Sequence, residues 1–328
     1  DEFTNFKNPG NEIVKKNIMD EYINEVISQA DSSSQKIKIV VDCGNGSAGE
    51  IAPKLMRKLG HQVVELFCKI DGNFPNHHPD PGKIENLQDL IKLVKSEEAD
   101  IGIAFDGDGD RLGVVSKKGD VIYPDQLMMI FSKEVLKNNP GKEIVFDVKC
   151  TNLLEAIIKE AGGIPVMSPT GHFHIKNTLK KTNAPLAGEM SGHIFFNDQW
   201  YGFDDAHYSA FRLIEILKMS KISIDALVED LPKAFSTPEM NLNVEENKKF
   251  QIVKNFTSKA DFGNANKITI DGLRVNFEDG WGLLRASNTT PKLVLRFEAN
   301  SPKRLNEIKN MFLTELKKID ESINIELS

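Results

Sequence analysis

The sequence predicts an α/β protein with two tandem α/β domains on mixed sheets, followed by a smaller α+β domain. Runs rich in Ile and Val alternate with stretches of helical spacing between residues 36 and 116, a pattern typical of strands connected by helices. The same order of elements restarts near residue 121. After residue 232 the strands are expected to pair antiparallel, with helices on one face.

In the first unit, residues 11–30 carry apolar side chains three and four positions apart, as in an amphipathic helix. The polar stretch that follows is interpreted as a linker. Two more helices are expected at 47–60 and 86–97. Strands are expected at the apolar runs 36–42, 61–67, 99–105 and 112–116.

The second and third units follow from the same patterns. In the second unit we expect helices at 125–137, 152–160, 172–181 and 204–220, and strands at 143–148, 164–167 and 185–189. In the third unit we expect strands at 237–244, 280–287 and 292–299, helices at 246–259 and 301–319, and a hairpin at 267–277. The pair Asp271-Gly272 is a favourable turn for that hairpin.

The composition argues against several classes of function. The net charge is −7, so the chain is a poor general ligand for nucleic acid or anionic membranes, which attract basic surfaces. No apolar run reaches the ~18 residues that a membrane helix needs, and residues 1–16 contain no apolar signal core. The odd set Cys43, Cys68 and Cys150 lacks metal-ligand spacing and predicts reduced thiols in a cytoplasmic protein.

The run Asp-Gly-Asp-Gly-Asp-Arg at residues 106–111 carries the strongest chemical signal. Three carboxylates at alternate positions repel one another, and the glycines let the loop curl so that all three point inward. A hard divalent cation removes that repulsion. The run follows a predicted strand, at a carboxyl end where α/β proteins place their sites. An EF-hand is rejected because it requires Gly at Arg111 and Glu at Lys117.

The run Gly-Glu-Met-Ser-Gly-His at residues 188–193 brackets a carboxylate, a hydroxyl and an imidazole with glycines. Such a turn can offer hydrogen bonds to neighbouring sugar hydroxyls, but it can equally be a turn that only connects strands. The loop Arg-Ala-Ser-Asn-Thr-Thr-Pro at 285–291, with Arg296 further on, suits a phosphate. Ser, Asn and Thr also form ordinary turns.

Two further candidates follow predicted strands. Lys149 comes after the strand at 143–148, and His172 belongs to Pro-Thr-Gly-His after the strand at 164–167. Taken alone, each is more often a surface residue or a polar residue satisfied by its neighbours.

Residues 44–49 fit the dinucleotide-binding pattern G-x-G-x-x-G, and Glu65 stands where a ribose-binding acid is expected. This pattern predicts NAD binding but leaves the three other motifs unexplained. We therefore favour a tight turn with close helix–strand packing.

The motifs at 106–111, 188–193 and 285–299 occur in this order about one domain apart. Their combination resembles the α-D-phosphohexomutase superfamily, most closely its bacterial phosphomannomutase/phosphoglucomutase branch. The resemblance begins near residue 18 and also covers VVDCGNGSAG, DVKCT and PTGH. It implies that the glycines of 44–49 form a turn of the second family domain.

The family has four domains around a central cleft. The resemblance assigns 18–120 to the second domain, 121–232 to the third and 233–328 to the fourth, with 1–17 as the tail of the first. In the family the first domain carries a phosphorylated serine in a T-x-S-H-N-P-like loop, which is not found in this sequence. The chain is therefore expected to be inactive without that domain.

The resemblance also assigns roles to individual residues. Mg²⁺ would be held by Asp106, Asp108 and Asp110, beside Arg111. The sugar and the phosphate that is not transferred would be held by Glu189, Ser191, His193, Arg285, Ser287, Asn288 and Thr289. Acid/base or phosphate contacts would come from Lys149, His172 and His193.

The implied reaction is the reversible conversion of mannose or glucose 1-phosphate into the 6-phosphate, with glucose 1,6-bisphosphate as intermediate or activator. The resemblance further implies a monomeric isomerase of carbohydrate metabolism. Two alternatives stay open: a non-catalytic fragment that binds sugar phosphate and Mg²⁺, and an NAD-dependent enzyme that uses Gly44 to Gly49.

Overall fold

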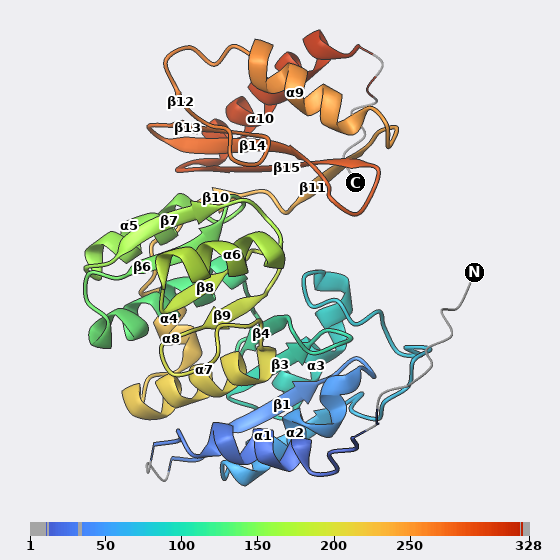
Figure 1. Ribbon diagram of the computed structural model, residues 1–328, viewed down its shortest axis with the longest axis vertical. Coiled ribbons are helices and arrows are strands. Elements are labelled where there is room, and N and C mark those ends of the chain that lie inside the picture. The colour runs from blue at the N-terminus through green and yellow to red at the C-terminus, as the bar shows by residue number, and fades with distance from the viewer. Residues whose placement is uncertain (1–10, 12, 32–34, 322, 324–328) are drawn as a thin grey trace.

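Three β-sheets are stacked along the long axis of the computed structural model, which describes residues 11, 13–31, 35–321 and 323 (Figure 1). Each sheet comes from one continuous stretch of chain. The first two sheets are mixed and the third is antiparallel, so the predicted fold class is confirmed. No helix in the described ranges is long and apolar enough to cross a membrane.

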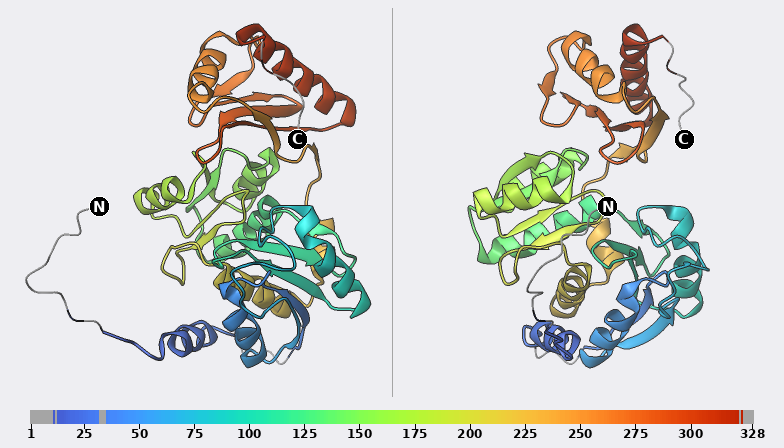
Figure 2. Two further views of the ribbon diagram at one scale, coloured as in Figure 1. Left: turned by 90° about the vertical axis from the view of Figure 1, so that its right-hand side faces the viewer. Right: turned by 45° about the vertical axis from the view of Figure 1, so that its right-hand side comes forward.

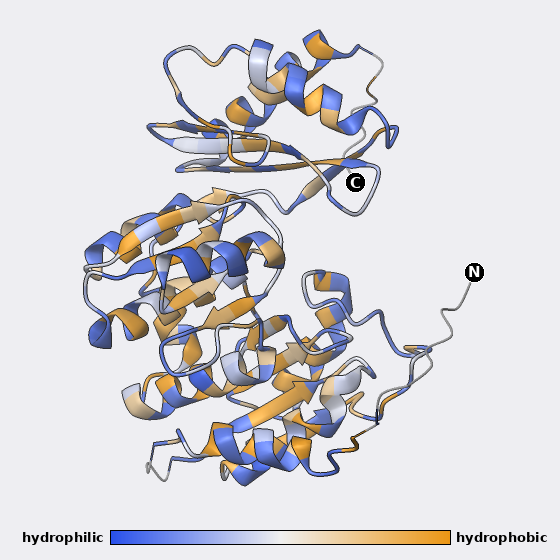
Figure 3. Cartoon of the chain, viewed as in Figure 1, coloured by the Kyte–Doolittle hydropathy of each residue, from blue (hydrophilic) through white to orange (hydrophobic). Residues whose placement is uncertain are grey.

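The first sheet has the order β2-β1-β3-β4-β5, parallel from β2 to β3 and antiparallel beyond β3. Its central strands are buried along their whole length, and the apolar colouring of these strands is visible in Figure 3. The strands are β1 (Lys38–Asp42), β2 (Gln62–Leu66), β3 (Ile101–Phe105), β4 (Leu112–Ser116) and β5 (Val121–Ile122). The helices are α1 (Ile18–Ile27), α2 (Ala52–Lys58) and α3 (Gln88–Ser96), with short 3₁₀ helices η1 (Ser47–Glu50) and η2 (Ile84–Leu87).

Three predicted helices differ from the structure in their extent. The helix expected at 11–30 is only α1, because Ile13 and Val14 are 90% and 67% exposed and gain nothing from helical packing. The helix expected at 47–60 is split into η1 and α2, because Pro53 has no N–H and fits only the first turn of a helix. The helix expected at 86–97 begins as η2 before α3.

The second sheet has the order β7-β6-β8-β9. Its strands are β6 (Glu143–Asp147), β7 (Ile164–Ser168), β8 (Leu186–Gly188) and β9 (Ile194–Phe196). The helices of this unit are α4 (Pro124–Asn138), α5 (Asn152–Glu160), α6 (His172–Thr182), α7 (Ala206–Ser220) and α8 (Ile224–Glu229). The sequence interpretation missed β9 and α8, which are too short to show a clear periodicity.

The third sheet is antiparallel, and its two helices cover one face (Figures 1 and 2). The predicted hairpin at Asp271-Gly272 is confirmed, since Ile268 pairs with Arg274. The strands are β10 (Phe235–Ser236), β11 (Met240–Asn243), β12 (Asn266–Ile268), β13 (Leu273–Phe277), β14 (Gly280–Ala286) and β15 (Lys292–Ala299), and the helices are α9 (Lys249–Lys259) and α10 (Pro302–Ile319).

The three units are joined in two ways. The first and second share one apolar core, to which α1, β1, α4 and α7 all contribute, whereas the third unit has a core of its own. The third unit is attached to the second through Arg274, which is fully buried. Its guanidinium donates to the carbonyls of Val148 and Cys150 and lies 3.7 Å from the centre of the Trp281 ring. The residues that directly follow β6 therefore lie at the junction of the second and third units.

Candidate active site

The loop of residues 106–111 is folded around the carboxylate of Asp106. Its Oδ1 accepts hydrogen bonds from the backbone N–H groups of Gly109, Asp110 and Arg111 at 3.0–3.1 Å, and its Oδ2 accepts from Arg111 Nε at 2.7 Å. Burial opposes ionisation of Asp106, but Arg111 outweighs it and the pKa of Asp106 is lowered. The loop thus keeps a buried negative charge at its centre.

The three aspartates predicted as metal ligands can offer oxygen atoms that lie within 4.8 Å of one another. Burial raises the pKa of Asp110 to about 6, with the neighbouring carboxylates adding to the effect. Asp110 Oδ1 is buried and has no hydrogen-bond partner among the described residues. Converging hard oxygen donors and an unsatisfied buried carboxylate oxygen fit a divalent cation such as Mg²⁺. This geometry brings Asp106, Asp108 and Asp110 together.

The glycines of residues 44–49 are explained by packing behind this loop. A Cβ on Gly46 would lie 2.7 Å from the carbonyl oxygen of Gly107, and a Cβ on Gly49 would lie 2.0 Å from that of Cys68. The N–H of Ser47 donates to Gly107 O at 3.0 Å. Glu65, the expected ribose ligand of the dinucleotide hypothesis, pairs with Arg57 instead. The sequence pattern therefore has a structural explanation: Gly46 packs against the 106–111 loop and Gly49 packs against Cys68, just after β2.

The turn at 188–193 lies directly beside the 106–111 loop. Arg111 forms an antiparallel bridge with His193, and the N–H of Leu112 donates to Gly192 O at 3.1 Å. Gly192 has φ +102, and a Cβ there would lie 3.0 Å from the carbonyl oxygen of Leu112. Only glycine allows this close approach. The contact between the first and second units therefore places His193 next to Asp110, with Nδ1 and Oδ1 3.5 Å apart.

Glu189 is buried within this turn. Its Oε2 accepts from the N–H of Gly171 at 3.2 Å and from the Ser191 hydroxyl at 3.4 Å, while Oε1 has no partner among the described residues. Burial, reinforced by the charge of Asp147, raises the pKa of Glu189 to about 7. A buried carboxylate with a free oxygen is suited to accept hydrogen bonds from ligand hydroxyls.

Asp204 was not identified from the sequence, yet it gathers two predicted residues. Its Oδ2 lies 3.3 Å from His193 Nδ1 and 3.4 Å from His172 Nδ1, and its Oδ1 lies 2.7 Å from Lys176 Nζ. The pair of aspartates before α7 was a usable signal, because only one residue can cap a helix. Asp205 takes that role by accepting from the N–H of Tyr208, which leaves Asp204 free for another.

Lys149 follows β6 and is buried, with its Nζ 3.0 Å from Glu239 Oε2. Burial opposes its charge, but Asp147 and Glu239 outweigh the effect and the pKa of Lys149 is raised. It is therefore a cation at neutral pH, a state that suits contact with a phosphate better than the role of a base.

The 285–290 loop belongs to the third unit. Ser287 Oγ accepts from the N–H groups of Thr289 and Thr290, while Asn288 and Thr289 are exposed. Arg285 is 4% exposed and pairs through Nε with Asp271. Loops 169–172 and 285–290 are adjacent, since a Cβ on Gly171 would lie 3.9 Å from Asn288 Nδ2.

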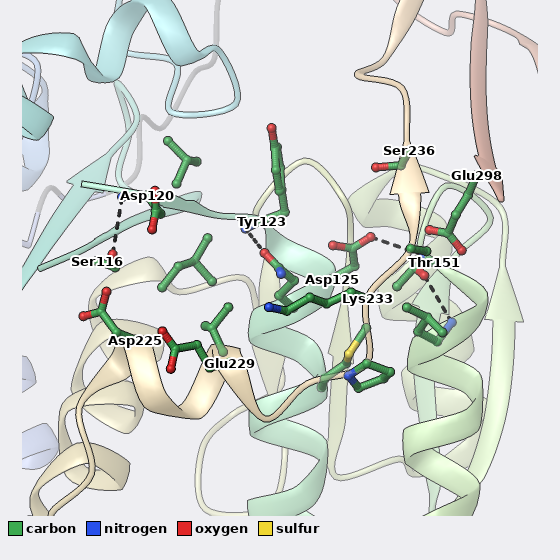
Figure 4. A pocket seen from close by; sticks show the side chains of 18 of the residues that line it. Ser116, Asp120, Tyr123, Asp125, Thr151, Asp225, Glu229, Lys233, Ser236 and Glu298 are labelled. Atoms are coloured by element: carbon green, nitrogen blue, oxygen red, sulfur yellow. Dashed lines mark hydrogen bonds between the residues drawn. The ribbon is translucent and has the colours of Figure 1, made fainter. Parts of the chain in front are cut away.

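Arg296, which the sequence interpretation placed near the phosphate loop, has structural partners instead. Its guanidinium donates to the carbonyl of Lys149 and to Asp125. It lines a separate cavity of about 440 Å³ between Asp125 and Thr151 on one side and Asp225 and Glu229 on the other (Figure 4). Apart from Arg296, none of the predicted site residues lines this cavity.

Comparisons with known proteins find relatives for each of the three units. Models of the phosphoglucomutase/phosphomannomutase family match as α/β/α domain II over residues 20–119, α/β/α domain III over 123–235 and the C-terminal domain over 239–315. The phosphomannomutase/phosphoglucomutase of Pseudomonas syringae pv. tomato is 54% identical over 95% of this chain and 67% of its own length. The phosphoglucomutase of Neisseria gonorrhoeae is 51% identical over 92% of this chain and 65% of its own.

A crystal structure of a phosphoglucomutase/phosphomannomutase family protein from Burkholderia thailandensis has the same fold. It superposes with a TM-score of 0.88 at 50% identity, over 94% of this chain and 66% of that protein. The chain thus spans about two thirds of the length of the relatives it matches. With three consecutive domain models and more than half of its residues shared with such a relative, the chain belongs to the phosphoglucomutase/phosphomannomutase family.

Proposed function

We propose that the chain is the greater part of a phosphohexomutase that interconverts hexose 1-phosphates and hexose 6-phosphates. The observation that carries this proposal is the bridge between Arg111 and His193. It brings a cluster of carboxylates suited to a cation against a turn suited to sugar hydroxyls. A third loop, with Arg285, supplies a cation for a phosphate. Relatives that share half of this sequence are phosphomannomutases and phosphoglucomutases.

In this proposal Asp106, Asp108 and Asp110 hold Mg²⁺. When bound, the ion would withdraw charge from a phosphoryl group during its transfer. Arg111 is held by Asp106 and Asp80 and adds positive charge beside the same group. Lys149, which is buried and follows β6, contributes a further cation.

The remaining residues hold the substrate. Glu189 and Ser191 would accept and donate hydrogen bonds at the sugar's 3- and 4-hydroxyls, with His193 and His172 nearby. Arg285, Ser287, Asn288 and Thr289 would hold the phosphate that is not being transferred. None of these contacts distinguishes position 2, where glucose and mannose differ, so both sugars should be accepted.

The phosphoryl group itself would come from a phosphoserine on sequence outside residues 1–328. A sugar phosphate that receives it becomes a 1,6-bisphosphate. That intermediate must turn around so that its other phosphate faces the serine. A fixed phosphate grip and a clamp on two hydroxyls suit this cycle, because both orientations of the sugar can present these features.

The proposal is tested by a coupled assay that follows glucose 6-phosphate formed from glucose 1-phosphate. Residues 1–328 alone should show no turnover. The full product of the encoding gene, with Mg²⁺ and a trace of glucose 1,6-bisphosphate, should turn over both glucose and mannose 1-phosphate. Turnover by residues 1–328 alone would contradict the placement of the serine. An inactive full-length product would contradict the mutase assignment.

A further inference from the structure

Asp271, in the hairpin turn between β12 and β13, has one carboxylate oxygen that accepts hydrogen bonds from two units of the molecule. Asp271 Oδ2 accepts from Arg285 Nε in its own unit at 2.9 Å, and from the backbone N–H of Thr170 in the neighbouring unit at 3.0 Å. Thr170 lies in the 169–172 loop, 101 residues before Asp271. A single side chain therefore connects the loop of Arg285 with a loop of the second sheet.

The position of Asp271 is set by close backbone packing. Gly272 has φ +75, and a Cβ there would lie 2.2 Å from Leu284 O and 2.7 Å from Arg285 Cα. The turn therefore presses directly on β14, and only glycine fits. As a result, the carboxylate of Asp271 is held within hydrogen-bond distance of Arg285 Nε.

This pairing leaves part of Arg285 available. The residue is 4% exposed, and its Nη2 has no hydrogen-bond partner within the described ranges. An unsatisfied buried donor on a charged group is costly. The binding of an acceptor to Nη2 removes that cost. Asp271 engages Nε and leaves Nη2 without an acceptor, so an anion that reaches Nη2 would satisfy this donor.

The other end of the connection reaches the sugar side of the site. The hydroxyl of Thr170 donates to Asp147 Oδ2 at 2.9 Å, and Asp147 Oδ1 accepts from the N–H of Met190 at 3.1 Å. The next N–H, of Gly171, donates to Glu189 Oε2 at 3.2 Å. Loop 169–172 thus fixes the turn that carries Glu189 relative to Asp271.

We infer that Asp271 is a positioning residue that sets the phosphate grip of Arg285 at a fixed place relative to the sugar-binding turn. The inference rests on the proposed function of that site. A ligand that carries both a phosphate and a sugar benefits from the connection, whereas inorganic phosphate uses the Arg285 side alone. Asp271 thereby contributes to selectivity for hexose phosphates over free phosphate.

The sign of the effect separates positioning from simple charge. Removing a carboxylate beside Arg285 makes the site more positive, which by Coulomb attraction alone would tighten the binding of an anion. If Asp271 acts by positioning, its removal weakens binding despite the gain in positive charge.

The test is calorimetric titration of residues 1–328 and of Asp271→Asn with glucose 6-phosphate and with inorganic phosphate. We expect Asp271→Asn to weaken the affinity for glucose 6-phosphate by about tenfold, the scale of one hydrogen bond to a charged group. The affinity for inorganic phosphate should fall by less. Asp279→Asn is the matched control, because Asp279 also pairs with an arginine Nε at 2.9 Å, that of Arg304, away from the site. It should change neither affinity.

Unchanged or tighter binding of glucose 6-phosphate to Asp271→Asn would overturn the inference, and an equal loss for both ligands would overturn the coupling between the loops. If Asp271→Asn fails to fold, Asp271→Glu keeps the charge but shifts the carboxylate, and it should show the same direction of effect.

A measurement without ligand keeps the inference separate from the proposed function. The ¹⁵N–¹H signal of Arg285 Nε, assigned by its loss in Arg285→Lys, should be slow to exchange in the wild type. It should shift and exchange faster in Asp271→Asn but not in Asp279→Asn. If the wild type binds no hexose phosphate, the proposed function fails, and this signal still decides: an unchanged signal in Asp271→Asn contradicts the positioning role.

Discussion

The 106–111 loop, which is the proposed metal site and is called the metal loop below, and the loops proposed to hold the substrate are built in different ways. In the metal loop, Asp106 is held by the N–H groups of residues three to five positions further along the chain. In the substrate half, Glu189 is held by Gly171 from another loop and Arg285 by Asp271 from a hairpin. One region is organised by its own sequence, and the other is assembled from loops of two units.

This difference has a physical consequence. A loop whose central carboxylate, Asp106, is satisfied by its own backbone and by Arg111 keeps its geometry as long as the short segment is folded. A site made from several loops depends on the packing between units, and here that packing relies on Arg274, Arg296 and Asp271. We therefore expect substitutions in the metal loop to change turnover, and substitutions in the other region to change ligand affinity and stability.

The largest expected effect is on turnover, from Asp108→Asn in the full-length protein. Asp108 is the exposed member of the three aspartates, so its loss removes a metal ligand without disturbing the core. We expect kcat to fall by about 10³-fold, while the melting temperature and the affinity for glucose 6-phosphate stay near those of the wild type. The measurement is the coupled assay at saturating Mg²⁺. Near-normal turnover would argue against the metal assignment and against the independence of the two regions.

The next largest effect is on stability, from Arg274→Ala. This change leaves the carbonyls of Val148 and Cys150 without their donor and removes the stacking on Trp281. Burial lowers the pKa of Arg274 to about 10, so the residue is still charged at neutral pH. We expect the free energy of unfolding in urea to fall by about 3 kcal/mol.

Arg274→Ala should also weaken the affinity for glucose 6-phosphate. The affinity for Mg²⁺ should stay within about twofold of the wild-type value, because the metal loop does not depend on the contacts of Arg274. Arg304→Ala, which removes an ion pair with Asp279, is the control and should change stability by about 0.5 kcal/mol or less. Parallel losses of Mg²⁺ and sugar-phosphate affinity in Arg274→Ala would show that the two regions are coupled.

The smallest effect is a pH dependence from Glu189→Gln. The folded pKa of Glu189, about 7, lies above the ordinary value of 4.5. The stability linked to its proton is therefore fully present below pH 4.5 and is lost as the pH rises through 7. We expect Glu189→Gln and the wild type to be equally stable at pH 5, and the variant to be more stable at pH 8 by about 1–3 kcal/mol.

Urea denaturation at both pH values measures this difference, with Glu160→Gln on the exposed side of α5 as the control. A difference between variant and wild type that is the same at pH 5 and pH 8 would contradict a raised pKa. Such a result would mean that Glu189 is more exposed to solvent than it is in the structure.

Much of the fold was predictable because its signals are local. Alternating apolar runs gave the positions of β1, β3, β6 and β15, and the Asp271-Gly272 pair gave a hairpin. The prediction was wrong where the helical pattern of 47–60 continued through Pro53. It also missed β9, whose three residues pair only once β8 lies beside them.

Asp204 and Asp271 could not be assigned from the sequence for a related reason. The partners of Asp204 lie on α6 and in the 188–193 turn, and the more distant partner of Asp271 lies 101 residues away. Nothing in the sequence around Asp271 distinguishes it from an ordinary turn aspartate, and the Asp204-Asp205 pair shows only that one of the two is not needed as an N-cap. Their roles depend on which loops the tertiary structure brings together.

The sequence by itself determined the composition of the site: three aspartates spaced by glycines, a turn with Glu189, Ser191 and His193, and a loop with Arg285. Spacing along the chain was enough to find these residues, but only the 106–111 loop is held mainly by its own backbone. Only the tertiary structure decided that the metal loop and the sugar turn meet at Arg111 and His193, and that Asp271 aligns Arg285 with Glu189 through the 169–172 loop. These contacts join strand ends of different sheets, and packing between separate units fixes such distances.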